Sequence, residues 1–260
     1  MTIKILGYGR WCTGKTRQIA SIIERVGKDK VFIVSCSDGL QTIAGTYKAE
    51  HCFEVRSRDG LRSAWAQLIG GKGDGPLCKT AGAWLLFDGL TEACEWIEDE
   101  AIDTLDEVAR AVARGERSAV TGKAKEWLRF VNSDGGPDNQ KAYGPIGTDC
   151  KLLIDYWSVR LPESVAGVYM TAHEQESQRD RQIGPPYTPK LPGKTAREHV
   201  MGKMDYVFRM IADNGGTAQM DPAKVNYYWS RTRENRAVSG ELPKEWPQFN
   251  LAKFVELVGS

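Results

Sequence analysis

The eight residues from 9 to 16 constrain this chain more than any other stretch. They read Gly-Arg-Trp-Cys-Thr-Gly-Lys-Thr, which is the spacing Gly-x-x-x-x-Gly-Lys-Thr. In this spacing the glycines let the main chain approach an anion closely, and the amides of the turn surround a phosphate. The spacing has this meaning when a strand precedes it and a helix follows it. Because residues 2–6 predict a strand and residues 16–26 predict a helix, we predict a phosphate-binding loop.

Each part of this loop has an expected role. The amides at the start of the following helix would contact the β-phosphate of a nucleotide. Lys15 would neutralise the β- and γ-phosphates, and the Thr16 hydroxyl would join the ligand shell of Mg²⁺. ATP and Mg²⁺ are therefore the expected ligands. The residues expected to contact the nucleotide are Gly9, Arg10, Trp11, Cys12, Thr13, Gly14, Lys15, Thr16 and Arg17.

The rest of the chain alternates between apolar runs typical of strands and segments typical of helices. Strands are expected over 30–39, 51–55, 83–89, 164–174, 204–213 and 224–233. Helices are expected over 60–71, 90–114 and 150–161, and residues 251–258 fit either a helix or a strand. This alternation predicts an α/β fold with a mostly parallel sheet and helices on both of its faces.

Neither an internal repeat nor a linker divides the chain, so one domain over residues 1–260 is expected. Two stretches depart from the alternating pattern. Residues 116–147 mix basic and aromatic side chains around a Gly-, Asp- and Asn-rich run, and residues 175–203 are rich in proline, glycine and basic side chains. Both predict long loop excursions from the domain.

Composition excludes several classes of protein. The formal net charge of +1 argues against a protein that coats nucleic acid by bulk charge, so any nucleic-acid surface must be local. The six cysteines include no Cys-x-x-Cys pair, which argues against structural zinc and disulfides and favours a cytoplasmic protein. No apolar run approaches the length of a membrane span, and the N-terminus does not resemble a signal peptide.

An acidic residue at the end of a buried strand is the second part that such a nucleotide site needs. Asp88 follows the apolar run of residues 84–87, and we expect it to hold Mg²⁺ through water and to pair with Thr16. The next residue is Gly89, although many ATPases carry their catalytic base at that position. Asp38 is the leading candidate for the base, with a plain turn role as an equal alternative. Its competitors are Glu54, Asp59 and Glu174.

Three more residues complete the candidate set. His173, at the polar end of a strand, is expected to sense the γ-phosphate through a hydrogen bond, with a capping or loop role as the alternative. Arg231 and Arg233 alternate at a strand end and so point to one side of it. They are expected to reach the γ-phosphate of a neighbouring subunit as arginine fingers, and solvated surface arginines are the alternative.

Taken in order along residues 3–236, these motifs resemble the RecA-type core ATPases. The motifs are the N-terminal loop, Asp38-Gly39, Asp88 without a following Glu, "TAHE" and "SRTR". They are most similar to the short phage-encoded Sak-type single-strand annealing ATPases. The departures are Asp at position 38, where Glu is usual, His at position 173, where Gln is common, and the unusual loop residues Arg10 and Trp11.

The resemblance implies a RecA-like P-loop NTPase core that hydrolyses ATP with Mg²⁺ in the cytoplasm of a bacterial host cell. It also implies a homo-oligomeric ring or filament acting on single-stranded DNA in recombination, annealing or replication, with a single-strand DNA-binding protein as a further expected partner. Residues 117–141 and 179–203 are the expected places of DNA contact, and ordinary solvated surface is the alternative. The competing functions are a DNA-packaging or helicase-loader motor, a small-molecule or nucleotide kinase, and a nucleotide-binding scaffold.

Overall fold

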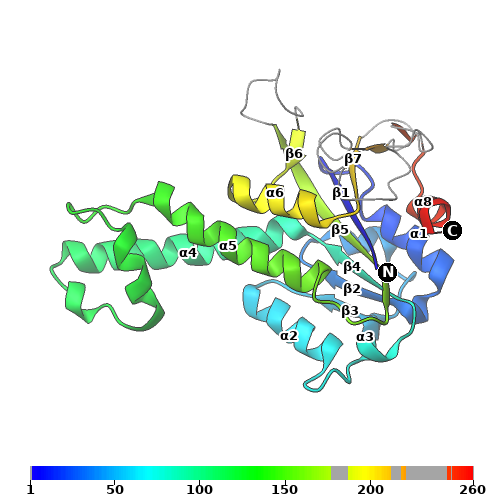
Figure 1. Cartoon of the computed structure of the whole chain (residues 1–260), viewed down its shortest axis with the longest axis horizontal. Helices are drawn as coiled ribbons and strands as arrows, with labels where there is room; N and C mark the ends of the chain where they lie inside the picture. The colour runs from blue at the N-terminus through cyan, green and yellow to red at the C-terminus, as the bar shows by residue number, and fades with distance from the viewer. Residues whose placement is uncertain (1, 177–186, 212–217, 221–244, 247, 260) are drawn as a thin grey trace.

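The computed structural model describes residues 2–176, 187–211, 218–220, 245–246 and 248–259. Its centre is a sheet of nine strands (Figure 1). The strands are β1 (Ile3–Gly9), β2 (Val31–Ser35), β3 (Cys52–Glu54), β4 (Ala83–Asp88), β5 (Val165–Glu176), β6 (Tyr187–Pro189), β7 (Tyr206–Met210), β8 (Ala218–Met220) and β9 (Glu245–Trp246).

The sheet is mostly parallel. Its order is β3-β2-β4-β5-β1-β7-β8-β9, with β6 paired to the end of β5. The strands from β3 to β7 in that order run parallel, and β6, β8 and β9 pair antiparallel. Parallel strands end at one edge of a sheet, so β1, β2, β4 and β5 present their carboxyl ends together. The predicted α/β class with a mostly parallel sheet is confirmed.

Helices cover the sheet on both faces. They are α1 (Arg17–Val26), α2 (Arg58–Ile69), α3 (Pro76–Lys79), α4 (Leu90–Ala113), α5 (Asn139–Ser158), α6 (Gly193–Lys203) and α8 (Leu251–Gly259). On one face, α1 and α8 pack against side chains such as Ile33 and Leu86. On the other face, α2, α4, α5 and α6 pack against side chains such as Leu85 and Phe87. Alternate residues of one strand therefore enter opposite cores, which explains why the central strands are apolar throughout.

Two of the helices reach beyond the sheet and form an arm (Figure 1). The arm consists of the outer parts of α4 and α5 together with residues 114–138, which join the two helices at its far end. Residues 117–119 and 122–130 form 3₁₀ turns there. A small apolar cluster of Leu105, Phe130 and Ala142 holds these turns against the helices. Residues 114–138 are therefore packed against the helices of the arm.

The structure corrects the expected extent of both excursions. Residues 139–147 belong to α5, although Pro145 lies inside that helix. The helix begins where the Asp138 carboxylate accepts the Lys141 N–H at 3.1 Å, and burial of Ile146 offsets the cost of the proline. Residues 193–203 form α6, whose buried positions are Ala196, Val200 and Met201. The glycines and basic residues of this segment predicted a loop, but burial of these side chains stabilises a short helix.

Other segments agree with their expected type. Residues 251–259 form a helix, which decides between the two alternatives for that stretch. The expected strand over 224–233 lies outside the described residues. Within the described part of the chain, no helix combines the length and apolar character needed to cross a bilayer.

The central strands should dominate stability. Leu86 lies on β4 and is fully buried against the helices of its face. Leu86→Ala should therefore lower the free energy of unfolding by about 2–5 kcal/mol. Leu152→Ala, on the exposed side of α5, is the matched control and should cost less than about 1 kcal/mol. Urea denaturation followed by circular dichroism measures both. Equal losses would contradict the assigned core.

Candidate functional site

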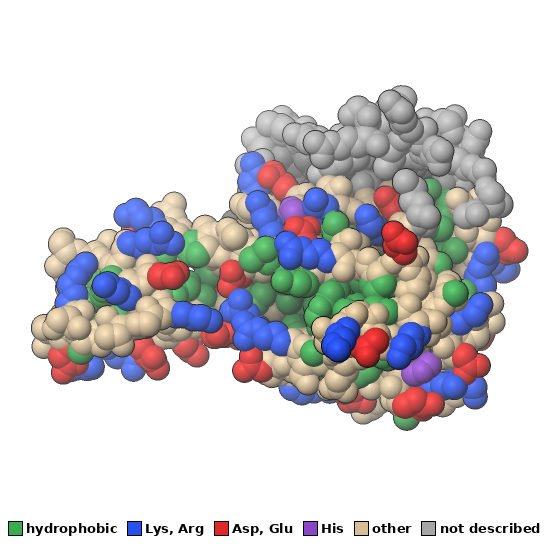
Figure 2. Space-filling view, turned by 60° about the horizontal axis from the view of Figure 1, so that its bottom comes forward, with side chains coloured by type: hydrophobic (Ala, Val, Ile, Leu, Met, Phe, Trp, Pro, Cys, Tyr) green, Lys and Arg blue, Asp and Glu red, His purple; other side chains and the backbone are tan. Residues whose placement is uncertain are grey.

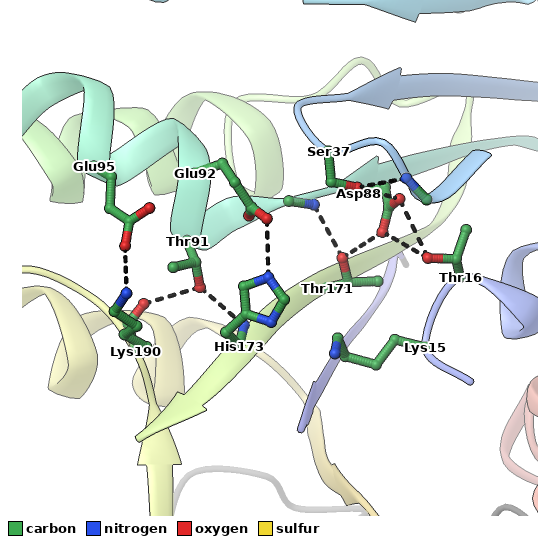
Figure 3. Close-up of polar contacts among 12 residues, drawn as sticks. Lys15, Thr16, Ser37, Asp88, Thr91, Glu92, Glu95, Thr171, His173 and Lys190 are labelled. Atoms are coloured by element: carbon green, nitrogen blue, oxygen red, sulfur yellow. Dashed lines mark hydrogen bonds and ion pairs between the residues drawn. The ribbon is translucent and has the colours of Figure 1, made fainter. Parts of the chain in front are cut away.

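The candidate site lies at the edge where the parallel strands end (Figure 3). In the register of β1 and β5, Gly9 stands opposite His173, and β4 on the other side of β5 ends at Asp88. The loop from Gly9 to Thr16 leaves this edge and enters α1. Ligands of open parallel sheets bind outside the carboxyl ends of the strands. The fold therefore brings the loop, Asp88 and His173 to the place where a ligand is expected.

The loop has the backbone of a tight anion-binding turn. Gly14 has a φ of +82°, a conformation that side chains with a Cβ rarely adopt. Cys12 adopts a φ of +60° despite its side chain, which is uncommon for a residue other than glycine. The Thr13 hydroxyl donates to the Arg10 carbonyl oxygen at 3.0 Å and braces the turn. Alternation of such conformations turns successive amides toward one concave side.

The Lys15 ammonium is turned back into this loop. It donates to the carbonyl oxygens of Gly9 at 2.9 Å and of Arg10 at 2.7 Å. Burial lowers the pKa of Lys15, although the charges of Asp88 and Glu92 act in the opposite direction. Within the described residues, no carboxylate is within ion-pair distance of this ammonium, so its charge is balanced only from a distance. A buried cation in this state favours an anionic ligand.

Asp88 is the most heavily hydrogen-bonded carboxylate at the site. Its Oδ1 accepts the Thr171 hydroxyl at 2.6 Å, and its Oδ2 accepts the Ser37 hydroxyl at 2.9 Å. The Thr16 hydroxyl lies 3.3 Å from both oxygens. Asp88 is only 2% exposed, so these three donors replace the water that an ionised carboxylate requires. The predicted pairing of Asp88 with Thr16 is present in the structure.

The donor set at Thr16 and Asp88 fits Mg²⁺. Both side chains offer oxygen atoms, which this hard cation prefers. Within the described residues, no group of three or more His, Cys, Asp or Glu side chains could hold a metal ion. Mg²⁺ fits this arrangement because it usually takes only one or two protein ligands and completes its shell with phosphate oxygens and water. Thr16 and Asp88 are the residues that would hold it.

His173 is held from three directions. Its Nε2 lies 2.9 Å from Glu92 Oε1, and its main-chain N–H donates to the Thr91 hydroxyl at 2.8 Å (Figure 3). The Trp11 ring, 73% exposed at the outside of the loop, lies over the imidazole with 4.1 Å between ring centroids. The histidine therefore connects the loop to the first turn of α4.

Glu92 is the partner that sequence reasoning missed. Burial alone would raise its pKa, but the hydrogen bond from His173 and the charge of Lys15 outweigh burial and lower it. The second carboxylate oxygen, Oε2, is buried and has no hydrogen-bond partner among the described residues. The only signal in the sequence is the spacing of four residues from Asp88, which places Glu92 in the first turn of α4.

Glu174 is engaged in another ion-pair cluster. Its side chain is 4% exposed and accepts Arg10 at 3.0 Å and Arg209 at 2.9 Å. The Arg209 guanidinium also lies 3.5 Å from the centre of the Tyr187 ring. Two arginines therefore neutralise this carboxylate and tie the loop to β5 and β7, an arrangement that suits structural support.

The structure places Asp38 apart from these groups. Asp38 follows β2 at the same edge, but its side chain is 91% exposed and pairs with Arg56 at 2.8 Å. The other two competitors for the base are also exposed: Glu54 pairs with Arg56 at 3.6 Å and Asp59 with Arg62 at 2.7 Å. The site therefore brings together Lys15, Thr16, Asp88 and His173, together with the unpredicted residues Ser37, Glu92 and Thr171.

The site as described does not include the remaining predicted features. Arg231 and Arg233 are outside the described residues, as is the basic segment 179–186 of the second excursion. Residues 117–130 lie at the far end of the arm. No protein-family model and no curated protein matches the chain. The fold and the site geometry thus define an α/β protein with a glycine-rich loop, a buried lysine and a buried aspartate at one edge of its parallel sheet.

The hydroxyls around Asp88 should stabilise the protein. Thr171→Val would leave Asp88 Oδ1 and the Gly89 N–H without the Thr171 hydroxyl, which bonds them at 2.6 and 3.0 Å. It should lower the free energy of unfolding by about 1–3 kcal/mol. Thr104→Val, where an exposed hydroxyl donates to the Glu100 carbonyl oxygen, is the control and should cost at most about 0.5 kcal/mol. Urea titrations measure both, and a neutral Thr171→Val would contradict this role.

Proposed function

We propose that this chain is a RecA-like P-loop ATPase that binds and hydrolyses ATP with Mg²⁺. The observation that carries the proposal is the buried Lys15 ammonium, held inside the Gly9–Thr16 loop without a carboxylate partner in the described residues. A triphosphate in the loop would supply the missing negative charge to this ammonium and to the amides of the turn. Thr16 and Asp88 stand beside the loop with oxygen atoms suited to Mg²⁺.

The same proposal assigns parts to the remaining groups. His173, opposite Gly9 in the strand register, would sense the γ-phosphate. Arg231 and Arg233 would stabilise transition-state charge in a neighbouring subunit of a ring or filament. Asp38 remains the base that the sequence favours, and its exposed ion pair with Arg56 does not favour that role. The resemblance to RecA-type ATPases supports these assignments, although positions 38 and 173 carry Asp and His where Glu and Gln are usual.

We further propose that the arm contacts single-stranded DNA during recombination, annealing or replication. Its far end carries Lys123, Lys125 and Arg129 next to Trp127 and Phe130. The Arg129 guanidinium lies 4.7 Å from the centre of the Phe130 ring. Lys and Arg side chains stand over the far end of the arm, and Asp and Glu side chains follow its lower border (Figure 2). Phe130 is buried, so the half-buried Trp127 is the ring that would stack on a base, beside cations suited to phosphate contact.

Removal of the loop ammonium should weaken nucleotide binding. Lys15→Ala should weaken ATP affinity by about tenfold to a hundredfold, because a charge-assisted hydrogen bond contributes about 1.5–3 kcal/mol. Isothermal titration calorimetry with Mg²⁺ and ATP measures the affinity. Lys79→Ala, at an exposed position in α3, should bind ATP like the wild type. Unchanged affinity of Lys15→Ala would contradict the proposed site.

Binding of DNA by the arm should depend on charge at its tip. The double variant Lys123→Ala/Lys125→Ala should bind a single-stranded oligonucleotide more weakly and with a smaller salt slope, while its affinity for ATP is unchanged. Lys28→Ala/Lys30→Ala, a lysine pair of the same spacing outside the arm, is the matched control. Fluorescence anisotropy over a salt series measures binding, and the ATPase rate with and without DNA measures coupling. Equal affinities of the two double variants would contradict contact through the arm.

A further inference from the structure

Gly89 has no side chain, and the Glu92 carboxylate lies close to it. It directly follows Asp88, has a φ of +103° and begins the turn into α4. A Cβ built on Gly89 would lie 3.1 Å from Glu92 Oε2 and 3.0 Å from the Cβ of Cys36. Glu92 Oε2 therefore lies next to the place where a side chain at position 89 would begin. Many ATPases carry their catalytic carboxylate at that position.

The carboxylate of Glu92 is held in one orientation, but only one of its two oxygens has a hydrogen-bond partner among the described residues. Oε1 is fixed by His173 Nε2 at 2.9 Å, whereas Oε2 has no hydrogen-bond partner among the described residues, although it is buried. His173 Nδ1 is buried and equally without a partner in this part of the chain. Two buried polar atoms, Glu92 Oε2 and His173 Nδ1, thus lack the partner that such atoms normally find.

A water molecule at the end of a triphosphate would give Glu92 Oε2 and His173 Nδ1 a hydrogen-bond partner. Figure 3 shows Lys15, His173 and Glu92 extending from three different elements toward the same region beside Asp88. The positive charge of Lys15 also favours the ionised form of Glu92 and lowers its pKa. Water has two O–H donors, and an ordered carboxylate can accept one of them and turn the oxygen toward phosphorus.

We propose that Glu92 is the catalytic carboxylate of the ATPase and that His173 is its positioning residue. This inference rests on the proposed function. The water oxygen forms a bond to the γ-phosphorus while the bond from that phosphorus to the β–γ bridging oxygen breaks, and the electron pair leaves with ADP. The water proton passes to Glu92 Oε2 and then to solvent, which restores the carboxylate.

The other carboxylates of the site are less suited to this step. Asp88 already accepts three hydroxyls and would serve the metal ion. Glu174 is enclosed between Arg10 and Arg209, which hold it as an ion-pair partner. Asp38 is 91% exposed and pairs with Arg56 on the solvent side. Glu92 alone among these four combines a fixed orientation with a buried oxygen that has no partner among the described residues.

Steady-state and single-turnover ATP hydrolysis, with ATP binding measured in parallel, test the proposal. Glu92→Gln keeps the shape of the side chain and removes its basicity, so turnover should fall by about 10²–10⁴-fold while ATP affinity changes less than about threefold. Glu95 lies three residues further along α4 and pairs with Lys190, so Glu95→Gln is the matched control. This variant should hydrolyse ATP at the wild-type rate. Glu92→Asp should be intermediate, and it decides the matter if Glu92→Gln does not fold.

A double-mutant cycle tests the positioning role of His173. His173→Ala should slow turnover in the wild-type background and should have almost no further effect when Glu92→Gln is already present. A merely structural role of the histidine would instead give losses that multiply. The dependence should appear in kcat, with KM for ATP nearly unchanged.

Three results would overturn the inference. Wild-type turnover in Glu92→Gln would exclude the catalytic role, as would Asp38→Asn causing the larger loss of the two. Multiplicative losses in the cycle would exclude the positioning of Glu92 by His173. Failure of the proposed function is distinguishable, because a wild-type chain that neither binds nor hydrolyses ATP would refute both proposals before any variant is compared.

Discussion

The carboxylate of Asp88 joins the parts of the site. It accepts hydroxyls from Ser37 after β2, from Thr171 on β5 and from Thr16 at the start of α1. An ionised carboxylate that is 2% exposed is costly without such donors, so these three segments must meet at one point. That requirement determines where the Gly9–Thr16 loop lies relative to the neighbouring strand ends, and through the loop it determines the place of the Lys15 ammonium.

The sheet provides the rigidity that this meeting point needs. Side chains of β4 alternate between two apolar cores, so the strand that ends in Asp88 is packed from both faces. Close-packed interiors permit little displacement, and a site built at the end of such strands is held within a narrow geometry. The arm is different, because it extends beyond the sheet and is stabilised at its far end by a small cluster around Phe130.

The carboxylate of Glu92 lies next to the place that a side chain at position 89 would take. Position 89 has no side chain, and α4 begins immediately after it, so the residue three positions later returns to the same side of the helix. The absence of a Cβ at Gly89 leaves room for the returning carboxylate, and His173 fixes its orientation. His173 also explains why burial does not raise the pKa of Glu92, since the hydrogen bond from the imidazole favours the charged form of the carboxylate.

The sequence alone determined the features that depend on neighbours along the chain. The loop spacing, the apolar run before Asp88, the α/β alternation and the strand of His173 are local patterns, and most of the expected strands and helices followed from them. Tertiary structure decided the rest. Ser37, Thr171 and Glu92 join the site because distant strand ends are adjacent in the sheet, which no local pattern encodes. Likewise α5 continues through Pro145, and α6 forms in a stretch rich in loop residues, because burial against the core outweighs their low intrinsic helix propensity.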